Sequence, residues 1–207
     1  IIHNQYDVVH SHVHFFSGII VKVAKQCGVK KLIVHSHNIS DGKPNTIIRE
    51  IYRSVMRSFI LKNSSYLLGC SLEAIEHLYG KKDDPRIIKI NNGIDIEQFS
   101  NLTKKREEIL RELNIPEDSF VVGHIGRFEK QKNHEFLVEI FKEILDRKSN
   151  SYLVLVGKGG LESVIKEKIT KYGIEDNVRL LGTRNDIPEI LNSFDVFVFP
   201  SLYEGLG

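Results

Sequence analysis

The chain has 207 residues, of which 41% are hydrophobic, and its 29 basic and 27 acidic residues give a formal net charge of +2. This length permits a sizeable core, as one large or two small domains. The balanced charge argues against a nucleic-acid partner, since such binders usually concentrate a strong basic excess. The sequence shows neither a run of about eighteen apolar residues nor a signal-peptide pattern, so we expect a cytoplasmic protein. Cys27 and Cys70 have no metal-ligand or redox spacing, and we expect both to be buried thiols.

Short apolar runs alternate with longer amphipathic stretches, which is typical of a parallel sheet covered by helices. In the first half, strands are predicted at 7–10, 31–35, 66–69 and 86–90, and helices at 16–27, 44–61 and 71–79. Ser71 is the expected N-cap of the last of these helices, with Glu73 in its first turn.

A turn-forming cluster at 91–95 and a charged stretch at 104–114, closed by Pro116, indicate a domain junction. Beyond it, strands are predicted at 120–125, 152–156, 178–181 and 196–199, and helices at 133–146, 161–172 and 186–192. We therefore expect an α/β protein with two Rossmann-like domains, residues 1–100 and 101–207. The ends of the chain lead us to expect that the first domain is truncated at its start and the second at its end.

A glycine, an arginine and a lysine follow the predicted strand at 120–125. Gly126 permits close backbone approach, Arg127 offers a planar fork of donors to phosphate oxygens, and Lys132 adds a compact charge at the start of a helix. Ligands of open α/β sheets bind at the carboxyl ends of strands, so the two cations suit a diphosphate. Alternatively, both cations are solvated loop charges, and Glu129 cancels one of them.

Two further glycine-rich turns follow predicted strands. The turn at 157–160 lacks the spacing of a dinucleotide fingerprint and the ending of a P-loop, and the alternative is a tight strand-to-helix connection. After the last predicted strand, Glu204 stands directly before a glycine-rich segment at 205–207, whose backbone N–H groups could bind an anion. The alternative is a surface glutamate in a turn.

Histidines gather near the ends of two predicted strands. His10, His12 and His14 would share one face if the first strand continued, and His35 and His37 repeat the pattern. Such pairs can ligate zinc or a hydrolase metal pair. We expect His12 and His14 to lie beyond the strand, and carboxylate ligands are not evident in this half. We therefore expect no metal, and favour histidines that line a cleft or pack at its floor.

The predicted helix at 44–61 carries a possible membrane-facing stripe. Arg49, Arg53 and Arg57 recur at a spacing of four beside an apolar face that includes Ile47 and Ile48. The stripe could contact anionic lipid headgroups at the inner face of the cell membrane. The alternative is a solvated basic face on a helix whose apolar face packs on the core.

The order of these segments resembles the retaining glycosyltransferases of group 1, also called family 4. In that family a Gly-Arg pair followed by lysine, a Val-Gly-x-Gly turn, and Asp-Val-x-Val-x-Pro-Ser followed by Glu-Gly-x-Gly recur together, and the match here runs over residues 7–207. Its marks in the first half are the histidine-containing stretches at 7–12 and 34–38, Cys70-Ser71, and Asn92-Gly93-Ile94-Asp95 with Phe99. The details look most like the branch that builds bacterial exopolysaccharide and capsule.

The resemblance implies a GT-B fold, in which two Rossmann-like domains face a cleft, and it implies roles for particular residues. Gly126, Arg127 and Lys132 would bind the donor diphosphate. Many relatives carry glycine where this chain has Asn133, a residue that also tolerates a left-handed backbone. Glu204 and His37 are the expected catalytic groups. Around the donor sugar and phosphate we expect Glu204, Gly205, Leu206 and Gly207. Near the base we expect Gly182 and Thr183. The family's second glutamate would fall after Gly207.

By resemblance, the reaction is a metal-independent, retaining transfer of a hexose from a nucleoside diphosphate sugar, expected to be a UDP-sugar. The acceptor would be a polysaccharide or lipid-linked saccharide in exopolysaccharide or capsule synthesis. The nucleotide sugar is a substrate, so no cofactor is expected. The alternatives are a nucleotide-sugar epimerase of the same architecture and an inactive fragment that binds a nucleotide sugar.

Overall fold

A computed structural model describes residues 6–205 and divides the chain into two compact units. The first unit comprises the residues up to Gly93 together with the segment from Tyr203, and the second comprises Ile94–Leu202. The division therefore falls after Gly93, earlier in the chain than the boundary after residue 100 that the composition suggested.

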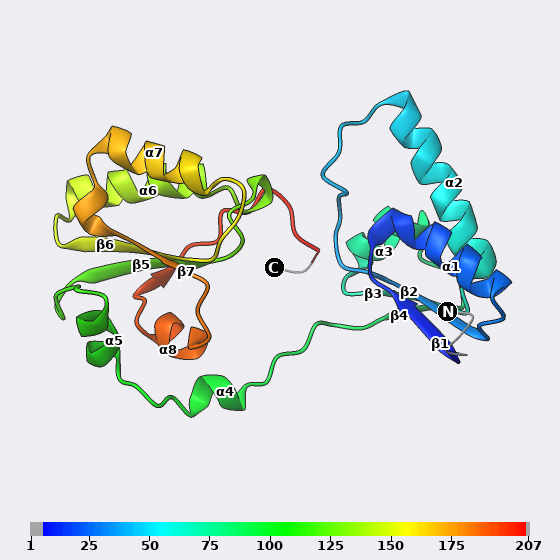
Figure 1. Ribbon diagram of the computed structural model, residues 1–207, viewed down its shortest axis with the longest axis horizontal. Coiled ribbons are helices and arrows are strands. Elements are labelled where there is room, and N and C mark those ends of the chain that lie inside the picture. The colour runs from blue at the N-terminus through cyan, green and yellow to red at the C-terminus, as the bar shows by residue number, and fades with distance from the viewer. Residues whose placement is uncertain (1–5, 206–207) are drawn as a thin grey trace. The chain divides into compact units, whose positions relative to one another are not determined.

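The first unit is built on a parallel sheet of four strands in the order β1-β2-β3-β4 (Figure 1). The strands are β1 (Val8–Ser11), β2 (Lys31–Ser36), β3 (Tyr66–Gly69) and β4 (Ile87–Lys89). They alternate with a 3-10 turn, η1 (His14–Phe16), and the helices α1 (Ser17–Gln26), α2 (Ile47–Asn63) and α3 (Leu72–Tyr79). As expected, the Ser71 side chain caps α3 by accepting a hydrogen bond from the Ala74 amide.

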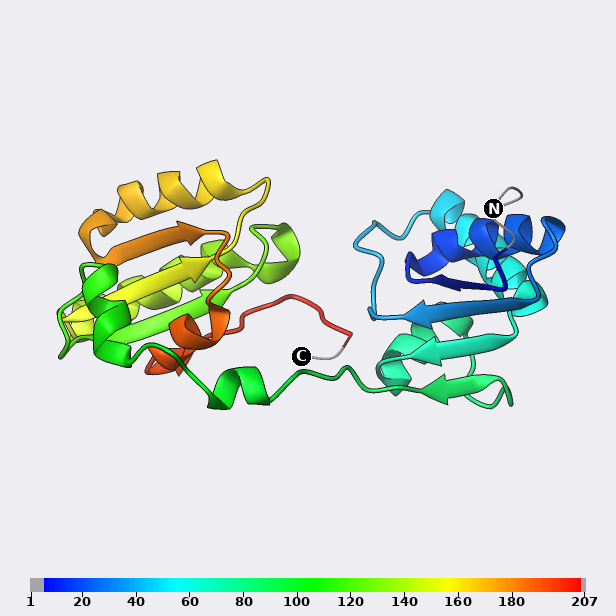
Figure 2. The same ribbon diagram turned by 60° about the horizontal axis from the view of Figure 1, so that its bottom comes forward.

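The three helices of this unit pack on one face of its sheet (Figure 2). Leu32 and Val34 of β2 and Leu67 of β3 contribute to the core on that face. The buried Tyr79 hydroxyl lies 2.8 Å from the Val34 carbonyl oxygen and 2.6 Å from that of Leu68, and so ties α3 to two strands. Because side chains alternate along a strand, residues between these core positions point to the opposite face.

Helix α2 is oriented differently from the sequence prediction. Its Ile47 and Ile48 are 82% and 81% exposed, whereas Arg53 is only 8% exposed. Arg49 and Arg53 both form ion pairs with Asp41, and Arg57 donates hydrogen bonds to backbone carbonyls of α3. The basic stripe is therefore used inside the unit, and the apolar residues at the start of α2 face solvent.

The second unit holds a parallel sheet in the order β7-β6-β5-β8. Its strands are β5 (Phe120–Ile125), β6 (Ser151–Val156), β7 (Val178–Gly182) and β8 (Val196–Phe197). Its helices are α4 (Glu97–Ser100), α5 (Arg106–Glu112), α6 (His134–Arg147), α7 (Glu162–Tyr172) and α8 (Ile187–Asn192), and two 3-10 turns are η2 (Lys130–Lys132) and η3 (Glu175–Asn177). Helices α6 and α7 cover one face, whereas α5 and α8 cover the other (Figure 1).

The charged stretch at 104–114 is part of this core and not an extended junction. Ile109 and Leu110 of α5 are buried in one cluster with Val121, Val154 and Ile190. Two adjacent apolar residues are enough for a helix of seven residues to pack on the face of the sheet, while its charged residues remain in water.

Within residues 6–205, no helix combines the length and the apolar character that a membrane crossing requires. Cys70 is buried as expected, but Cys27 is only partly buried, and neither cysteine forms a disulfide.

Candidate functional site

The order of strands in the second unit places a topological switch point beside β5. From β5 the chain proceeds to β6 and β7 on one side, and then returns to place β8 on the other side. In open α/β sheets, ligands bind outside the carboxyl ends of the strands at such a point. The segments that leave β5 and β8 contain the predicted phosphate-binding residues.

The loops that follow β5, β6 and β7 are joined by backbone hydrogen bonds. The Gly126 amide donates to the Val156 carbonyl at 2.9 Å, and the Gly157 amide donates to the Gly182 carbonyl at 2.8 Å. A Cβ atom on Gly157 would lie 2.0 Å from the Gly126 oxygen, and one on Gly159 would lie 2.4 Å from the Phe128 oxygen. These glycines are therefore required where backbones meet, which gives the turn at 157–160 a structural role.

Arg127 stands at the outer side of this group of loops. Its side chain is exposed and makes no hydrogen bond or ion pair with any residue from 6 to 205. The guanidinium group can therefore accept an anionic ligand without breaking an internal contact. Gly126 beside it is partly buried, because its backbone is held against β6.

Lys132 lies where the segment after β5 meets the segment after β8. Its ammonium group is 4.6 Å from the centre of the Phe199 ring. The Leu202 amide donates to the Gln131 carbonyl at 2.8 Å, and the Asn133 side chain donates to the Pro200 carbonyl at 3.2 Å. The structure thus joins two segments that are about 70 residues apart in the sequence, as the switch-point geometry requires.

Asn133 adopts the left-handed conformation that its position requires. Its φ angle is +55°, and it ends η2 and begins α6. This confirms that asparagine takes a conformation that would otherwise favour glycine.

The remaining residues predicted for the donor lie at two places. Gly182 has a φ angle of +64° and ends β7, and the exposed Thr183 follows it at the same end of the sheet. Glu204 and Gly205 belong to the segment grouped with the first unit, where a Cβ atom on Gly205 would lie 1.7 Å from the His37 carbonyl oxygen. Leu206 and Gly207 lie outside the described residues.

Histidines gather at the carboxyl ends of β1 and β2, as the sequence suggested. His12 Nδ1 lies 2.7 Å from His37 Nε2, and the His35 and His37 rings are stacked with their centres 4.1 Å apart. Burial, followed by the neighbouring histidines, lowers the pKa of His35 to about 4, and burial together with His12 lowers the pKa of His37. The His35 and His37 imidazoles are therefore neutral near pH 7. His14 is separate, since it lies in η1 with its ring against Phe15 and His77.

Two buried histidines of the second unit were not recognised from the sequence. His124 of β5 and His134 of α6 meet edge to face, with ring centres 4.7 Å apart. His124 Nδ1 lies 2.8 Å from the Val198 carbonyl oxygen, and a Cβ atom on Gly126 would come within 2.8 Å of His124 Nε2. His124 thus supports both Gly126 and the segment after β8. A histidine within the apolar run Val-Val-Gly-His-Ile was the available signal.

Two Rossmann-like α/β units, with Arg127 and Lys132 after β5 at the switch point of the second, are the features expected of the GT-B class. Residues 105–207 match the family model of the glycosyl transferases group 1. The chain belongs to this family, and the predicted fold class is confirmed.

Curated relatives extend the similarity over nearly the whole chain. The chain is 34% identical over 203 residues to EpsF of Bacillus subtilis (strain 168), and this alignment covers 97% of the chain and 53% of the relative. It is 32% identical over 211 residues to the UDP-Gal:alpha-D-GlcNAc-diphosphoundecaprenol alpha-1,3-galactosyltransferase of Escherichia coli, covering 98% and 54%. It is 30% identical over 206 residues to the capsular polysaccharide biosynthesis glycosyltransferase CapH of Staphylococcus aureus, covering 97% and 54%. The chain therefore spans about half the length of these relatives.

A solved structure supports the fold independently. The Anabaena protein Alr3699/HepE, crystallised in complex with UDP and glucose, aligns with a TM-score of 0.79 at 20% identity. The alignment covers 95% of this chain and 53% of that structure.

Proposed function

We propose that this chain forms the donor-binding part of a retaining glycosyltransferase that transfers a hexose from a UDP-sugar. The acceptor is a polysaccharide or a lipid-linked saccharide, in exopolysaccharide or capsule synthesis. Support for the donor comes from the UDP complex of the similar structure, and support for the acceptor comes from the names of the galactosyltransferase and of CapH.

The observation that carries the proposal is the arrangement of cations at the switch point beside β5. Arg127 is exposed with its guanidinium group available, and Lys132 lies beside the segment that leaves β8. Guanidinium and ammonium groups at this edge suit the two negative charges of a diphosphate. Gly126 permits the phosphate to approach the backbone, as loops at the start of helices often do.

In the proposed reaction, these cations stabilise the leaving nucleoside diphosphate as negative charge develops on it. The acceptor hydroxyl attacks from the same face as the leaving group, and a phosphate oxygen takes its proton. Glu204 binds sugar hydroxyls, and the neutral imidazole of His37 accepts or donates a hydrogen bond to a substrate hydroxyl. This scheme needs no metal ion or other cofactor.

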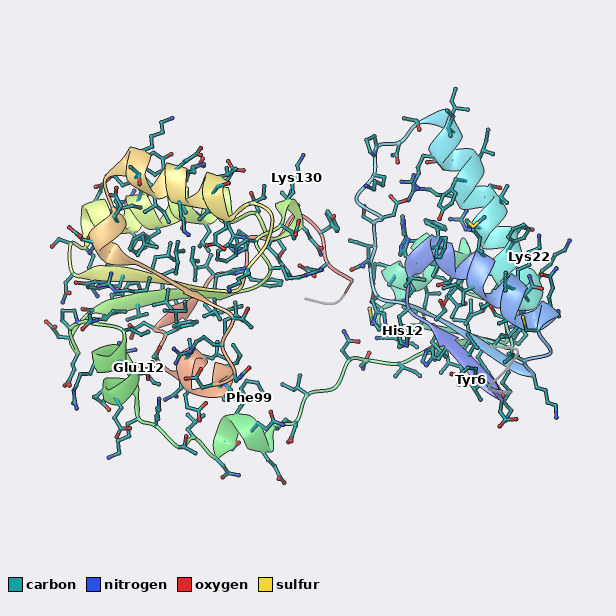
Figure 3. All side chains as sticks on the ribbon, in the orientation of Figure 1. Tyr6, His12, Lys22, Phe99, Glu112 and Lys130 are labelled. Carbon is teal, nitrogen blue, oxygen red and sulfur yellow. The ribbon has the colours of Figure 1, made fainter. Side chains whose placement is uncertain are left out.

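The site assignment can be tested by calorimetry of UDP binding to the full-length protein. We expect Arg127→Ala and Lys132→Ala each to weaken binding about 10-fold to 100-fold, because each removes a charge-assisted contact of about 1.5–3 kcal/mol. Lys130→Ala is the matched control, since Lys130 is an exposed lysine of the same loop (Figure 3) and should leave binding within about twofold. Unchanged affinity in both site variants would refute the assignment.

Epimerisation of the nucleotide sugar is the second candidate activity, because the same architecture serves it. An epimerase needs no acceptor. Incubation of the full-length protein with donor alone is therefore followed by analysis of the sugar product. An altered sugar indicates an epimerase, an unaltered sugar excludes one, and slow hydrolysis of the donor supports a transferase.

We also propose that the protein works in the cytoplasm with peripheral contact to the inner face of the membrane. The exposed isoleucines of α2 now support this contact, in place of the arginines, which are used internally. Sedimentation with liposomes should therefore decrease for Ile47→Ser and Ile48→Ser. Equal sedimentation of the variants and the natural protein would remove this part of the proposal.

A further inference from the structure

The sheet of the first unit carries a row of histidines on the face opposite its helices. In the pairing of β1 with β2, His10 lies opposite Ile33 and Ser11 lies opposite Val34, so His12 follows at the level of His35. Residues two apart on a strand share a face, and neighbouring parallel strands are about 4.8 Å apart. His10, His12 and His35 therefore project from one side of two adjacent strands by backbone geometry alone.

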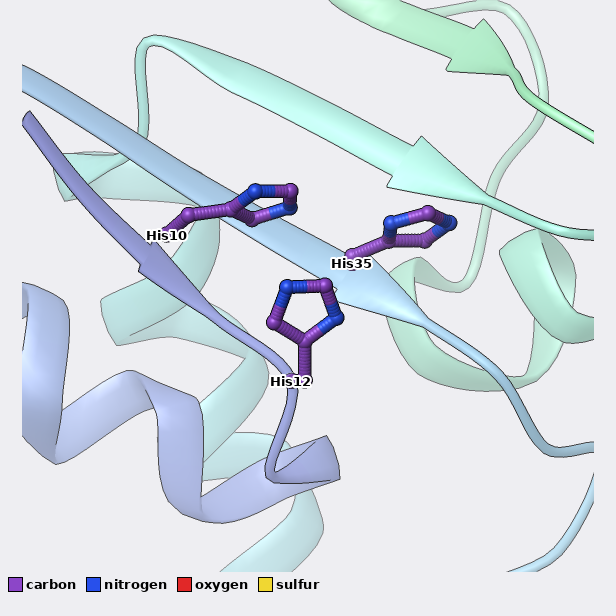
Figure 4. A group of neighbouring side chains, drawn as sticks. All are labelled: His10, His12 and His35. Carbon is purple, nitrogen blue, oxygen red and sulfur yellow. The ribbon is translucent and has the colours of Figure 1, made fainter. Parts of the chain in front are cut away.

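The side chains converge above the sheet (Figure 4). One ring nitrogen from each of His10, His12 and His35 lies within 4.8 Å of the corresponding nitrogens of the other two. The His35 ring is buried and is held between its neighbours, with the His10 ring stacked on it at 5.6 Å. His10 and His12 are exposed, so their rings can rotate. Three nitrogens around a tetrahedral zinc ion lie about 3.3 Å apart, given Zn–N distances of about 2.0–2.1 Å, so small rotations bring the set to ligand distance.

We propose that His10, His12 and His35 form a binding site for a divalent transition metal of the Zn²⁺ type. Three imidazoles that leave a fourth position to water match the ligand set of one known class of zinc site. Imidazole ligands suit Zn²⁺, Cu²⁺ and Ni²⁺, whereas Mg²⁺ and Ca²⁺ prefer oxygen ligands, and none of the three residues supplies one.

His37 supplies the outer contact that such a site requires. A histidine bound to metal through one nitrogen usually donates a hydrogen bond from the other, which fixes the orientation of its ring. His12 Nδ1 is already 2.7 Å from His37 Nε2, which leaves His12 Nε2 for the metal. The sequence showed no carboxylate ligands near these histidines, which argued against a metal site. In the structure, His35 of the neighbouring strand β2 supplies a third imidazole ligand, so a carboxylate is not required.

The three histidines differ from Arg127 and Lys132, the residues of the second unit proposed to bind the donor diphosphate, although their neighbour His37 is also assigned to a substrate hydroxyl in the proposed function. The inference therefore does not depend on glycosyl transfer, and its test uses the metal alone. The full-length protein, purified without a histidine tag and stripped with a chelator, is titrated with ZnCl₂ by calorimetry. We expect one Zn²⁺ per chain, and a loss of affinity of more than about 10-fold in each of His10→Ala, His12→Ala and His35→Gln, because loss of an outer-shell partner alone costs about that much.

His77→Gln is the matched control, because it removes an imidazole of the same unit outside the three-histidine site, and it should bind Zn²⁺ as the natural protein does. Nuclear magnetic resonance of the natural protein tests the site without variants, which could fail to fold. Addition of Zn²⁺ should change the chemical shifts of the ring nitrogens of His10, His12 and His35. Absence of stoichiometric binding, an equal loss in His77→Gln, or shifts confined to other histidines would overturn the proposal.

Discussion

At the scale of single residues, Asp41 of the first unit is a nearly buried charge held by two arginines. Its carboxylate receives hydrogen bonds from Arg49 and Arg53, and the Asp41 and Arg53 side chains are only 5% and 10% exposed. Burial opposes ionisation of Asp41, but the hydrogen bonds from Arg53 and Arg49 outweigh it and hold the pKa of this carboxyl well below its usual range. The loop before α2 is therefore attached to the helix through a nearly buried ion pair.

We expect Asp41→Asn to lower the free energy of unfolding of the first unit by about 2–4 kcal/mol, because the buried Arg53 would keep only the exposed Glu50 as a counter-charge. Urea denaturation at pH 7 measures the change. Asp83→Asn, at an exposed position of the same unit, is the control and should stay within about 0.5 kcal/mol of the natural protein.

The same pair predicts how this difference depends on pH. The pKa of an aspartate carboxyl in the unfolded chain is about 3.9, and in the folded protein the pKa of Asp41 is lower. The ionised carboxylate therefore stabilises the fold fully at pH values above about 3.9, and this stabilisation is lost as the pH falls through the pKa of the folded state. The difference between natural protein and Asp41→Asn should therefore be constant from pH 7 to about pH 5 and shrink only below about pH 4. A difference that vanished near pH 6 would contradict the role given to Asp41.

At the scale of elements, α5 shows how a short charged helix can complete a core. Leu110→Ala should destabilise the second unit by about 2–4 kcal/mol, because Leu110 is fully buried against the sheet and its removal leaves a cavity. Thermal or urea unfolding measures this loss. Glu108→Ala, at an exposed position of the same helix, should change stability by less than about 0.5 kcal/mol, and a similar loss in both variants would contradict the packing role given to Leu110.

The helices and strands of both sheets were largely predictable, because alternation of apolar runs and amphipathic stretches is a local signal. The failures come from contacts made at a distance. In α5 the charges outnumber the apolar residues, so Ile109 and Leu110 were read as part of a junction. In α2 the buried face depends on Asp41, a loop residue whose position the helix pattern does not contain.

In the candidate site, too, the features that depend on local sequence were predictable and those that depend on distant contacts were not. Arg127 and Lys132 were predictable, since the strand that precedes them fixes their place at the edge of the sheet. The meeting of His10, His12 and His35 required knowledge that β1 and β2 are neighbours, which the sequence of either strand does not contain. His124 and His134 were missed because tertiary packing alone brings the two rings together.

At the scale of the whole molecule, the two units should respond to different ligands. Saturation at 100 times the dissociation constant stabilises a unit by about 2.7 kcal/mol, which slows hydrogen exchange through unfolding of that unit about 100-fold. We expect Zn²⁺ to protect peptides of β1 and β2, and UDP to protect peptides around 126–133 and 199–202 most strongly. Hydrogen exchange measured by mass spectrometry of the full-length protein tests both. Strongest protection by UDP in β1 and β2 would contradict the donor site.

Asn133 does more in this structure than a glycine at the same place would do. Glycine would permit the left-handed bend between η2 and α6, but it has no side chain to donate to the Pro200 carbonyl. Asparagine therefore performs two tasks in one residue: it shapes the loop after β5 and tethers the segment that leaves β8. Exchange of asparagine for glycine at this position would therefore change how firmly these loops are coupled without altering the path of either backbone.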